Sequence, residues 1–174
     1  MSAPGHAGGE RLRDVCRSYP TGVVAVTAQT AEGPVGMAVN SFASVSLDPP
    51  LVLFCPARSS STWPLIRAAD GFAVNVLAAG QHEHAQRFAE RGVDRFAGVP
   101  HRGGRTGAPL LDEALAVIEC RVAAEHDGGD HWIVVADVLG LASLQTGPPL
   151  LFHGGRYGTP AELDALEPTT GERR

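Results

Sequence analysis

The sequence contains no lysine, because all 14 of its basic residues are arginines. This absence excludes any mechanism that forms a Schiff base on a lysine. It also excludes the phosphate-binding P-loop, whose lysine contacts the nucleotide phosphates. The glycine-rich stretch "GGRTG" at 103–107 therefore predicts an ordinary loop.

Cysteines, long apolar runs and basic clusters are also scarce. The three cysteines, Cys16, Cys55 and Cys120, are odd in number and far apart, which favours a reducing compartment over a disulfide framework. No apolar run approaches the roughly 20 residues of a membrane helix, and the N-terminus lacks the apolar core of a signal peptide. The net charge of −5 argues against nucleic acid and anionic membranes as partners. We expect a cytoplasmic protein.

No group of side chains stands out as a metal site or a catalytic triad. His82 and His84 lie two residues apart on an expected helix, so they point to different faces and cannot bind one metal together. Asp112 and Glu113 are expected in a solvated turn. We therefore predict no metal site.

The length of 174 residues favours a single domain, and 44% hydrophobic and 19% charged residues are typical of a globular chain. The sequence predicts a flexible head at 1–10, one domain at 11–159 and a polar tail at 160–174.

Short apolar runs separated by turn residues predict more strands than helices. Helices are expected at 11–19, 62–70 and 81–90, and a long loop at 92–109. The expected strands are 23–28, 35–46, 51–55, 72–77, 116–124, 132–144 and 150–152.

The fold class follows from the order of these elements. Ile118, Cys120 and Val122 share one face of a strand, and the strands are not separated by regular crossover helices. This order disfavours a doubly wound parallel sheet. It predicts a mainly β protein with short helices, arranged as an antiparallel barrel.

Hydroxyl groups cluster in "CPARSSST" at 55–62, between an apolar strand and a helix. Ser61 or Thr62 suits the N-cap of that helix, and Pro64 suits its first turn. A helix N-terminus with added hydroxyls and Arg58 is suited to a phosphate. An ordinary capped helix after a polar turn explains the same residues, and composition alone favours it.

A second mixed stretch, "GMAVNSFASVS" at 36–46, has amide and hydroxyl groups beside apolar side chains. Gly36 leaves room for a ligand to approach the backbone. The mixture suits a flat ring with a polar edge, although this stretch taken alone favours an ordinary half-exposed strand.

Seven segments carry a resemblance to a known family. They are "YPTGVVAVTA" (19–28), "GMAVNSFASVSLDPPLVLFCPARSSSTW" (36–63), "GFAVNVLAAGQ" (71–81), "RFAERGVDRFAGV" (87–99), "GAPLLDEALAVIECRV" (107–122), "DGGDHWIVVADV" (127–138) and "PLLFHGGRY" (149–157). In this order they resemble the flavin reductases, the small partners of two-component flavin-dependent monooxygenases. The resemblance implies a flavin-binding split β-barrel, with the flavin at a homodimer interface.

The resemblance also implies roles for individual residues. The flavin ring is expected to contact Met37, Ala38, Val39, Asn40 and Ser41. The ribityl chain and phosphate are expected to contact Cys55, Arg58, Ser59, Ser60, Ser61 and Thr62. The residues expected to border the flavin or the nicotinamide are Arg87, Phe88, Arg95 and Phe96.

His131 matches a family histidine near the nicotinamide, so the resemblance implies that it orients the hydride donor. Tyr157 matches a segment that covers the nicotinamide. Two departures are visible: Ala38 replaces a common threonine or serine, and "FHGGRY" differs from the usual pattern, which affects Arg156 more than Tyr157. Asn75 is a weaker candidate, with a structural role as the alternative.

The resemblance implies a reductase that transfers a hydride from NADH to FAD or FMN. The reduced flavin would pass to a monooxygenase of aromatic or natural-product metabolism. Two alternatives stay open, namely a non-catalytic flavin carrier or sensor and an oxidase of the pyridoxamine-phosphate type. The segments around His131 and Tyr157 favour the reductase.

Overall fold

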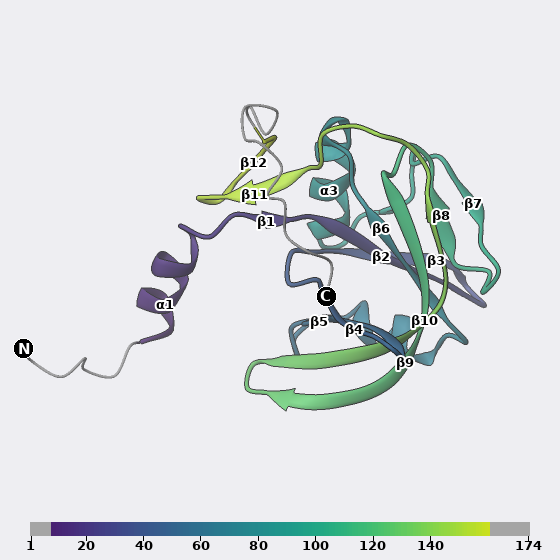
Figure 1. Cartoon of the computed structure of the whole chain (residues 1–174), viewed down its shortest axis with the longest axis horizontal. Coiled ribbons are helices and arrows are strands. Elements are labelled where there is room, and N and C mark those ends of the chain that lie inside the picture. Colours follow the sequence, from purple (N-terminus) through teal and green to yellow (C-terminus); the bar gives the residue numbers. More distant parts are fainter. Residues whose placement is uncertain (1–7, 161–174) are drawn as a thin grey trace, which may run out of the picture.

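A computed structural model describes residues 8–160 (Figure 1). Its helices are α1 (Gly9–Cys16), α2 (Trp63–Ala68) and α3 (His82–Ala89), and a 3-10 turn, η1 (Ala79–Gln81), precedes α3. The strands are β1 (Thr21–Gly22), β2 (Val24–Thr30), β3 (Gly33–Val39), β4 (Ala43–Leu47), β5 (Pro50–Phe54), β6 (Phe72–Val76), β7 (His101–Gly103), β8 (Pro109–Leu111), β9 (Ala116–Gly128), β10 (His131–Ser143), β11 (Leu151–His153) and β12 (Arg156–Gly158).

Seven strands form the main antiparallel sheet, in the order β3-β2-β6-β9-β10-β5-β4. Its longest members, β9 and β10, pair over nearly their whole length, with bulges at Val135/Ala136 and Val138/Gly140. Bulges bend strands and increase their twist, and the long hairpin curves beneath the rest of the sheet (Figure 1). The prediction of a mainly antiparallel β protein is confirmed.

The sheet curls but does not close. Its two edge strands, β3 and β4, follow one another in the chain and are joined by residues 40–42 only. Their edges form no ladder with each other among residues 8–160. The barrel wall is therefore split between the edges of β3 and β4, beside residues 40–42. We call this split the seam.

Apolar side chains fill both faces of the central strands. Val24 and Val26 of β2 join the interior cluster with Phe54 and Trp63, whereas Ala25 joins a second cluster beneath α3. Phe54 and Trp63 meet edge to face with ring centroids 5.4 Å apart. This contact fixes α2, and with it the loop that precedes α2, against the sheet interior.

Asn75 belongs to a buried hydrogen-bond network. Its amide nitrogen donates to Ala25 O at 3.1 Å and to Thr27 Oγ1 at 3.0 Å, and its amide oxygen accepts from Leu111 N at 2.8 Å. Thr27 Oγ1 in turn donates to Pro109 O at 2.6 Å. Asn75 therefore links β2 and β6 to β8. This structural role, given above as the alternative to a place in the flavin site, accounts for Asn75.

Replacing Asn75 by alanine should lower the free energy of unfolding by roughly 2–3 kcal/mol, because buried donors and acceptors lose their partners. Urea denaturation followed by circular dichroism measures this change. The exposed Asn40→Ala provides the matched control and should shift the midpoint little. A loss at Asn75 no larger than at Asn40 would show that the network contributes nothing.

Several boundaries differ from those expected. The segment 35–46 forms two strands, because the chain turns at the seam, and the long loop contains the hairpin β7–β8. The link between β9 and β10 is only Gly129-Asp130, where Gly129 takes a φ of 78° that suits a tight hairpin turn.

The proposed domain limits are tested little by the described residues. Helix α1 begins at Gly9, inside the head expected at 1–10, and has no buried residue. It projects from the body of the protein (Figure 1). Residues 1–7, and the tail expected at 160–174 apart from Pro160, lie outside the described residues.

Cys120 of β9 is fully buried, whereas Cys16 is exposed. Burial, with smaller contributions from Glu119 and Asp137, raises the pKa of the Cys120 thiol to about 12. Because the thiolate is the nucleophile, iodoacetamide at mildly alkaline pH should alkylate Cys16 and leave Cys120 unmodified. Peptide mass spectrometry checks this, and labelling in concentrated urea is the control. Equal labelling of both in the folded protein would contradict the burial.

Candidate functional site

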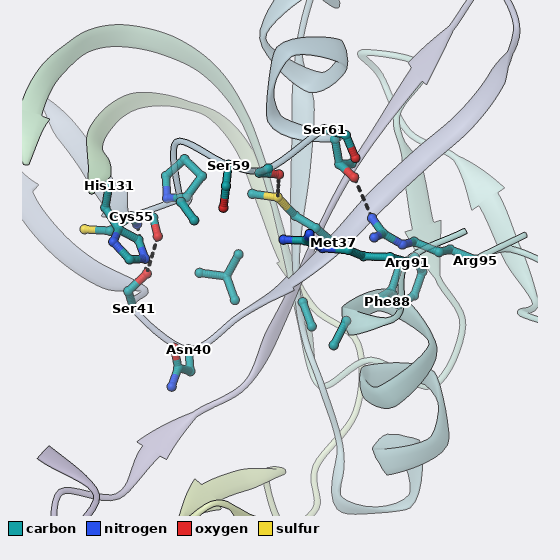
Figure 2. Close-up of a pocket in the computed structure, with 17 residues that line it drawn as sticks. Met37, Asn40, Ser41, Cys55, Ser59, Ser61, Phe88, Arg91, Arg95 and His131 are labelled. Atoms are coloured by element: carbon teal, nitrogen blue, oxygen red, sulfur yellow. Dashed lines mark hydrogen bonds between the residues drawn. The ribbon is translucent and has the colours of Figure 1, made fainter. Parts of the chain in front are cut away.

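A cavity of about 280 Å³ lies along the seam, between the end of β3 and the loop after β5 (Figure 2). Most of the residues predicted to contact the flavin meet here, together with His131. The lining consists of Met37, Ala38, Val39, Asn40, Ser41, Cys55, Pro56, Ala57, Ser59, Ser60, Ser61, Thr62, Phe88, Ala89, Arg91, Arg95 and His131.

The end of β3 forms an apolar wall. Met37 and Val39 are buried at 7% and 8% exposure, and Ala38 is half-buried. Ser41 does not direct a free hydroxyl into the cavity, since its Oγ accepts from Cys55 N at 2.8 Å and lies 3.3 Å from Cys55 O. The Ser41 side chain thus joins the two walls across the seam.

The serine-rich loop forms the opposite wall. Ser60 Oγ accepts from Trp63 N at 3.1 Å and so supports the start of α2, while Thr62 shows no capping bond of its own. The Ser59 and Ser61 side chains form no hydrogen bond with any residue in 8–160 and line the cavity. Their hydroxyls are available to a ligand.

Arg58 does not line the cavity, although we predicted it beside the phosphate. Its guanidinium lies 3.9 Å from the centroid of the Trp132 ring. Its Nη2 lies 2.7 Å from Asp127 Oδ2, and its Nε donates to Gly129 O at 2.7 Å. A sequence places Arg58 beside the serines but cannot give the direction of its side chain. The Arg58 side chain therefore stabilises the β9–β10 turn.

Arg91 and Arg95 supply the positive charge of the cavity instead. Arg95 Nη1 donates to Gly36 O at 2.8 Å and to Thr62 Oγ1 at 2.6 Å, and its Nε donates to Glu90 O at 2.8 Å. Burial, then the charge of Arg91, lowers the pKa of the Arg95 guanidinium. No carboxylate in residues 8–160 forms an ion pair with either arginine.

Arg91 was missed by the sequence reasoning. It lies inside the segment "RFAERGVDRFAGV" (87–99), where the expected helix gives way to a loop, and no spacing distinguishes it from the other arginines. The only available signal for a place beside an anion was that Arg91 comes shortly before Arg95 and has a single acidic neighbour, Glu90.

His131 lies at the opposite end of the cavity from the two arginines (Figure 2). Its Nδ1 lies 2.7 Å from Asp130 Oδ1. The contact with His131 lowers the pKa of the Asp130 carboxyl, which is therefore ionised at neutral pH. An ionised carboxylate only accepts hydrogen bonds, so Nδ1 carries the proton and Nε2 is left for a ligand.

Backbone contacts fix the position of His131. Its strand forms an isolated bridge with Ala57, and Trp132 N donates to Pro56 O at 2.9 Å. Arg58 N also donates to Asp130 O at 2.9 Å. The serine-rich loop and the histidine are therefore held as one unit.

The aromatic candidates lie at different depths. Phe88 lines the cavity and is fully buried, and Phe96 packs behind it with centroids 5.2 Å apart rather than in the lining. A Cβ added to Gly36 would lie 2.7 Å from the Phe88 ring. The space beside Gly36 that we assigned to a ligand therefore belongs to Phe88.

Tyr157 borders an adjoining cavity of about 200 Å³ rather than the main one. That cavity shares Ala38, Val39 and Asn40 with the main cavity, and burial raises the pKa of the Tyr157 hydroxyl. Tyr157 therefore lies on the far side of the apolar wall. Arg87 and Arg156 line no part of the main cavity.

Two observations concern the described part of the chain as a whole. None of the helices described in 8–160 is both long and apolar enough to span a membrane. Over the same range, no three His, Cys, Asp or Glu residues are grouped for a metal ion. The curled antiparallel sheet has an apolar wall, free hydroxyls and two neighbouring arginines at its seam, a combination suited to a flat ring that carries a phosphate.

Comparison with known proteins gives the family. A family model described as a flavin reductase like domain matches residues 16–161. The chain belongs to this family, and the resemblance inferred from its sequence is confirmed.

Individual relatives are similar over nearly their whole length. The chain is 47% identical to the FMN reductase (NADH) SmoA of Agrobacterium fabrum, over 89% of this chain and 88% of that protein. Among solved structures, nitrilotriacetate monooxygenase component B from Mycobacterium thermoresistibile has a TM-score of 0.89 and 41% identity, covering 93% of this chain and 91% of that one. The NADH:FAD oxidoreductase SgcE6 of Streptomyces globisporus, in complex with NAD and FAD fragments, has a TM-score of 0.85 and 38% identity, covering 94% and 99%.

Proposed function

We propose that this protein is an NADH-dependent flavin reductase that supplies reduced flavin to a separate monooxygenase. The observation that carries the proposal is the seam cavity, which has Ser61 and the two arginines at one end, His131 at the other, and Ser59 and Met37 between them. The names of the relatives support the reaction: an NADH-dependent FMN reductase, an NADH:FAD oxidoreductase and a monooxygenase component.

The residues present fit a flavin. Met37 and Val39 offer an apolar surface of the kind that packs against a flat ring, and Phe88 closes its edge. Ser59 and Ser61 have unpaired hydroxyls for a ribityl chain or a phosphate. The arginine pair, unpaired with any described carboxylate, suits the phosphate charge.

Bound flavin supplies the redox chemistry by accepting the hydride that NADH gives up. The protein's own residues bind and orient the two partners and exclude water. His131, whose ring is fixed by the bond from Nδ1 to Asp130, would orient the nicotinamide through its Nε2. Tyr157, on the β11–β12 hairpin, would cover the nicotinamide from the side of the adjoining cavity.

Oxidation of NADH by the purified protein, followed by its absorbance with FAD, with FMN and without flavin, tests this proposal. Flavin-dependent turnover is expected. Tight flavin binding without turnover would instead favour a carrier or sensor. Absence of both binding and turnover would contradict the proposal altogether.

We further propose a homodimer and a cytoplasmic location, the latter supported by three free cysteines in residues 8–160. Helix α1 supports the dimer, because Leu12 and Val15 are 58% and 66% exposed and Tyr19 just after it is 73% exposed. Such an apolar helix face is stabilised when another surface covers it.

Replacing Leu12 and Val15 together by glutamate should convert the dimer to a monomer, because two charges would be buried at the interface. Size-exclusion chromatography with light scattering should show the mass fall by about half. A wild-type protein of monomeric mass, or a double variant that stays dimeric, would exclude α1 as the dimer contact.

A further inference from the structure

A largely buried carboxylate, Glu125 of β9, contacts helix α2 from outside the main cavity. Trp63, the first residue of α2, is only 2% exposed, and its buried indole N–H needs an acceptor because it can only donate. Trp63 Nε1 donates to Glu125 Oε1 at 3.0 Å, and Glu125 Oε2 lies 2.8 Å from Arg67 Nε. The Glu125 side chain is 13% exposed and does not line the main cavity. Both of its oxygens therefore have partners on α2.

The backbone of Trp63 holds the serine-rich loop in turn. Trp63 N donates to Ser60 Oγ at 3.1 Å, and the same oxygen lies 3.7 Å from Met37 Sδ on the apolar wall. Ser59 and Ser61 flank Ser60, and both line the cavity (Figure 2). The position of Trp63 therefore determines where these two free hydroxyls lie.

The strands behind Trp63 lead to the other end of the cavity. Glu125 pairs with Val134 of β10, three residues after His131. Phe54, which meets the Trp63 ring edge to face, pairs with the same Val134 from the β5 side. The hairpin that carries His131 is thus joined to the Trp63 side chain by a hydrogen bond and by a ring contact.

The serine half of the loop depends on this link. Backbone bonds tie residues 56–58 to the start of β10, but among residues 8–160 no hydrogen bond joins residues 59–62 directly to β9 or β10. The other side-chain link, between Arg58 and Asp127, lies at the surface, with 35% and 77% of the two side chains exposed. Exposed ion pairs contribute little, whereas a buried hydrogen bond to a charged group contributes more. The contact between Glu125 and Trp63 is therefore the stronger of the two.

We propose that Glu125 is a positioning residue for flavin reduction, which acts through Trp63 to keep the hydroxyls of the serine-rich loop in a fixed position relative to His131. This inference deepens the proposed function and rests on it. A flavin held by these hydroxyls presents its ring to the hydride donor in one position, and reactants held in one geometry react faster. Loss of the link should therefore slow hydride transfer even when flavin and NADH are saturating.

Stopped-flow reduction of bound flavin at saturating NADH tests the inference. Glu125→Ala should lower the rate constant about tenfold, through misplacement of the bound flavin. Glu125→Gln should restore it to within about twofold of the wild type, because an amide oxygen can accept from the Trp63 indole as a carboxylate oxygen does. Arg67→Gln removes the ion pair at a 58% exposed side chain, keeps the Trp63 bond and should leave the rate unchanged.

A destabilised variant with an intact cavity distinguishes positioning from general stability. Asn75 lies in the buried network of β2, β6 and β8 and does not line the main cavity. Asn75→Ala should lower the free energy of unfolding without slowing the reduction of bound flavin. The rates are compared at a temperature at which circular dichroism shows every variant to be folded.

Three results would overturn the inference and leave the proposed function intact. The first is a rate in Glu125→Ala equal to that of the wild type, with flavin bound to both. The second is a Glu125→Gln variant as slow as Glu125→Ala, and the third is an Asn75→Ala variant as slow as Glu125→Ala. A wild-type protein that binds no flavin, or that does not reduce it with NADH, would instead refute the proposed function and this inference with it.

Discussion

Replacing His131 by alanine should lower NADH-dependent flavin reduction about 100-fold, which is the effect of misplacing a bound reactant by roughly 1 Å. The affinity for flavin should stay within about twofold, since the apolar wall, the hydroxyls and the arginines lie elsewhere in the cavity. Pre-steady-state reduction of bound flavin measures the first quantity, and fluorescence titration measures the second.

Two further variants distinguish the effect of the orientation of the His131 ring from the effect of its presence. Asp130→Asn removes the charged partner of His131 Nδ1, so the ring loses its fixed tautomer and the rate should fall by a smaller factor. His126→Ala alters an exposed histidine of the same hairpin outside the cavity and should change nothing. Turnover in His131→Ala equal to that of the wild type would remove His131 from the mechanism.

Replacing Ser61 and Arg91 together by alanine should weaken flavin binding about 100-fold. A hydrogen bond from a charged group contributes roughly 1.5–3 kcal/mol, and 1.4 kcal/mol corresponds to about a tenfold change in affinity. The reason is that both side chains line the phosphate end of the cavity and form no hydrogen bond or ion pair within 8–160. Fluorescence titration with FMN, which lacks the adenosine half, isolates this contribution.

Arg58→Ala is the informative comparison, because the sequence predicts the same role for Arg58 as the structure suggests for Arg91. Arg58 contacts Asp127 and Trp132 rather than the cavity, so its loss should leave flavin affinity within a few-fold. Its loss should instead slow turnover by loosening the turn that carries His131. A loss of affinity in Arg58→Ala as large as in Arg91→Ala would contradict the placement of these two side chains.

The sequence predicts the sheet well because its signals are local. The apolar run of β2 and the alternation in β9 identify strands whatever their partners, and the hydroxyl-rich loop identifies the start of α2. The short strands β1, β7, β8 and β12 escape prediction, because two or three residues carry little periodicity, whereas β11 was expected at 150–152 from its apolar residues.

The candidate site is predicted in part for the same reason. Ser59, Ser61 and Met37 lie where their own segments place them. Side-chain direction depends instead on contacts far along the chain: Arg58 turns toward Trp132, and the space beside Gly36 is filled by Phe88. Such long-range contacts leave no periodic pattern in a single sequence.

The open seam has a consequence for the time that a product stays bound. Because β3 and β4 form no ladder with each other, widening the gap between them breaks no strand pairing in the described sheet. The contacts that join the two walls come from side chains: the Ser41 hydroxyl bonds to the Cys55 backbone, Ser60 Oγ lies 3.7 Å from Met37 Sδ, and Arg95 bridges Gly36 O and Thr62 Oγ1. A protein that hands its flavin to another enzyme needs a dwell time long enough for reduction and short enough for delivery. A few side-chain contacts at the seam, rather than strand pairing, are therefore in a position to determine how fast flavin passes between two proteins.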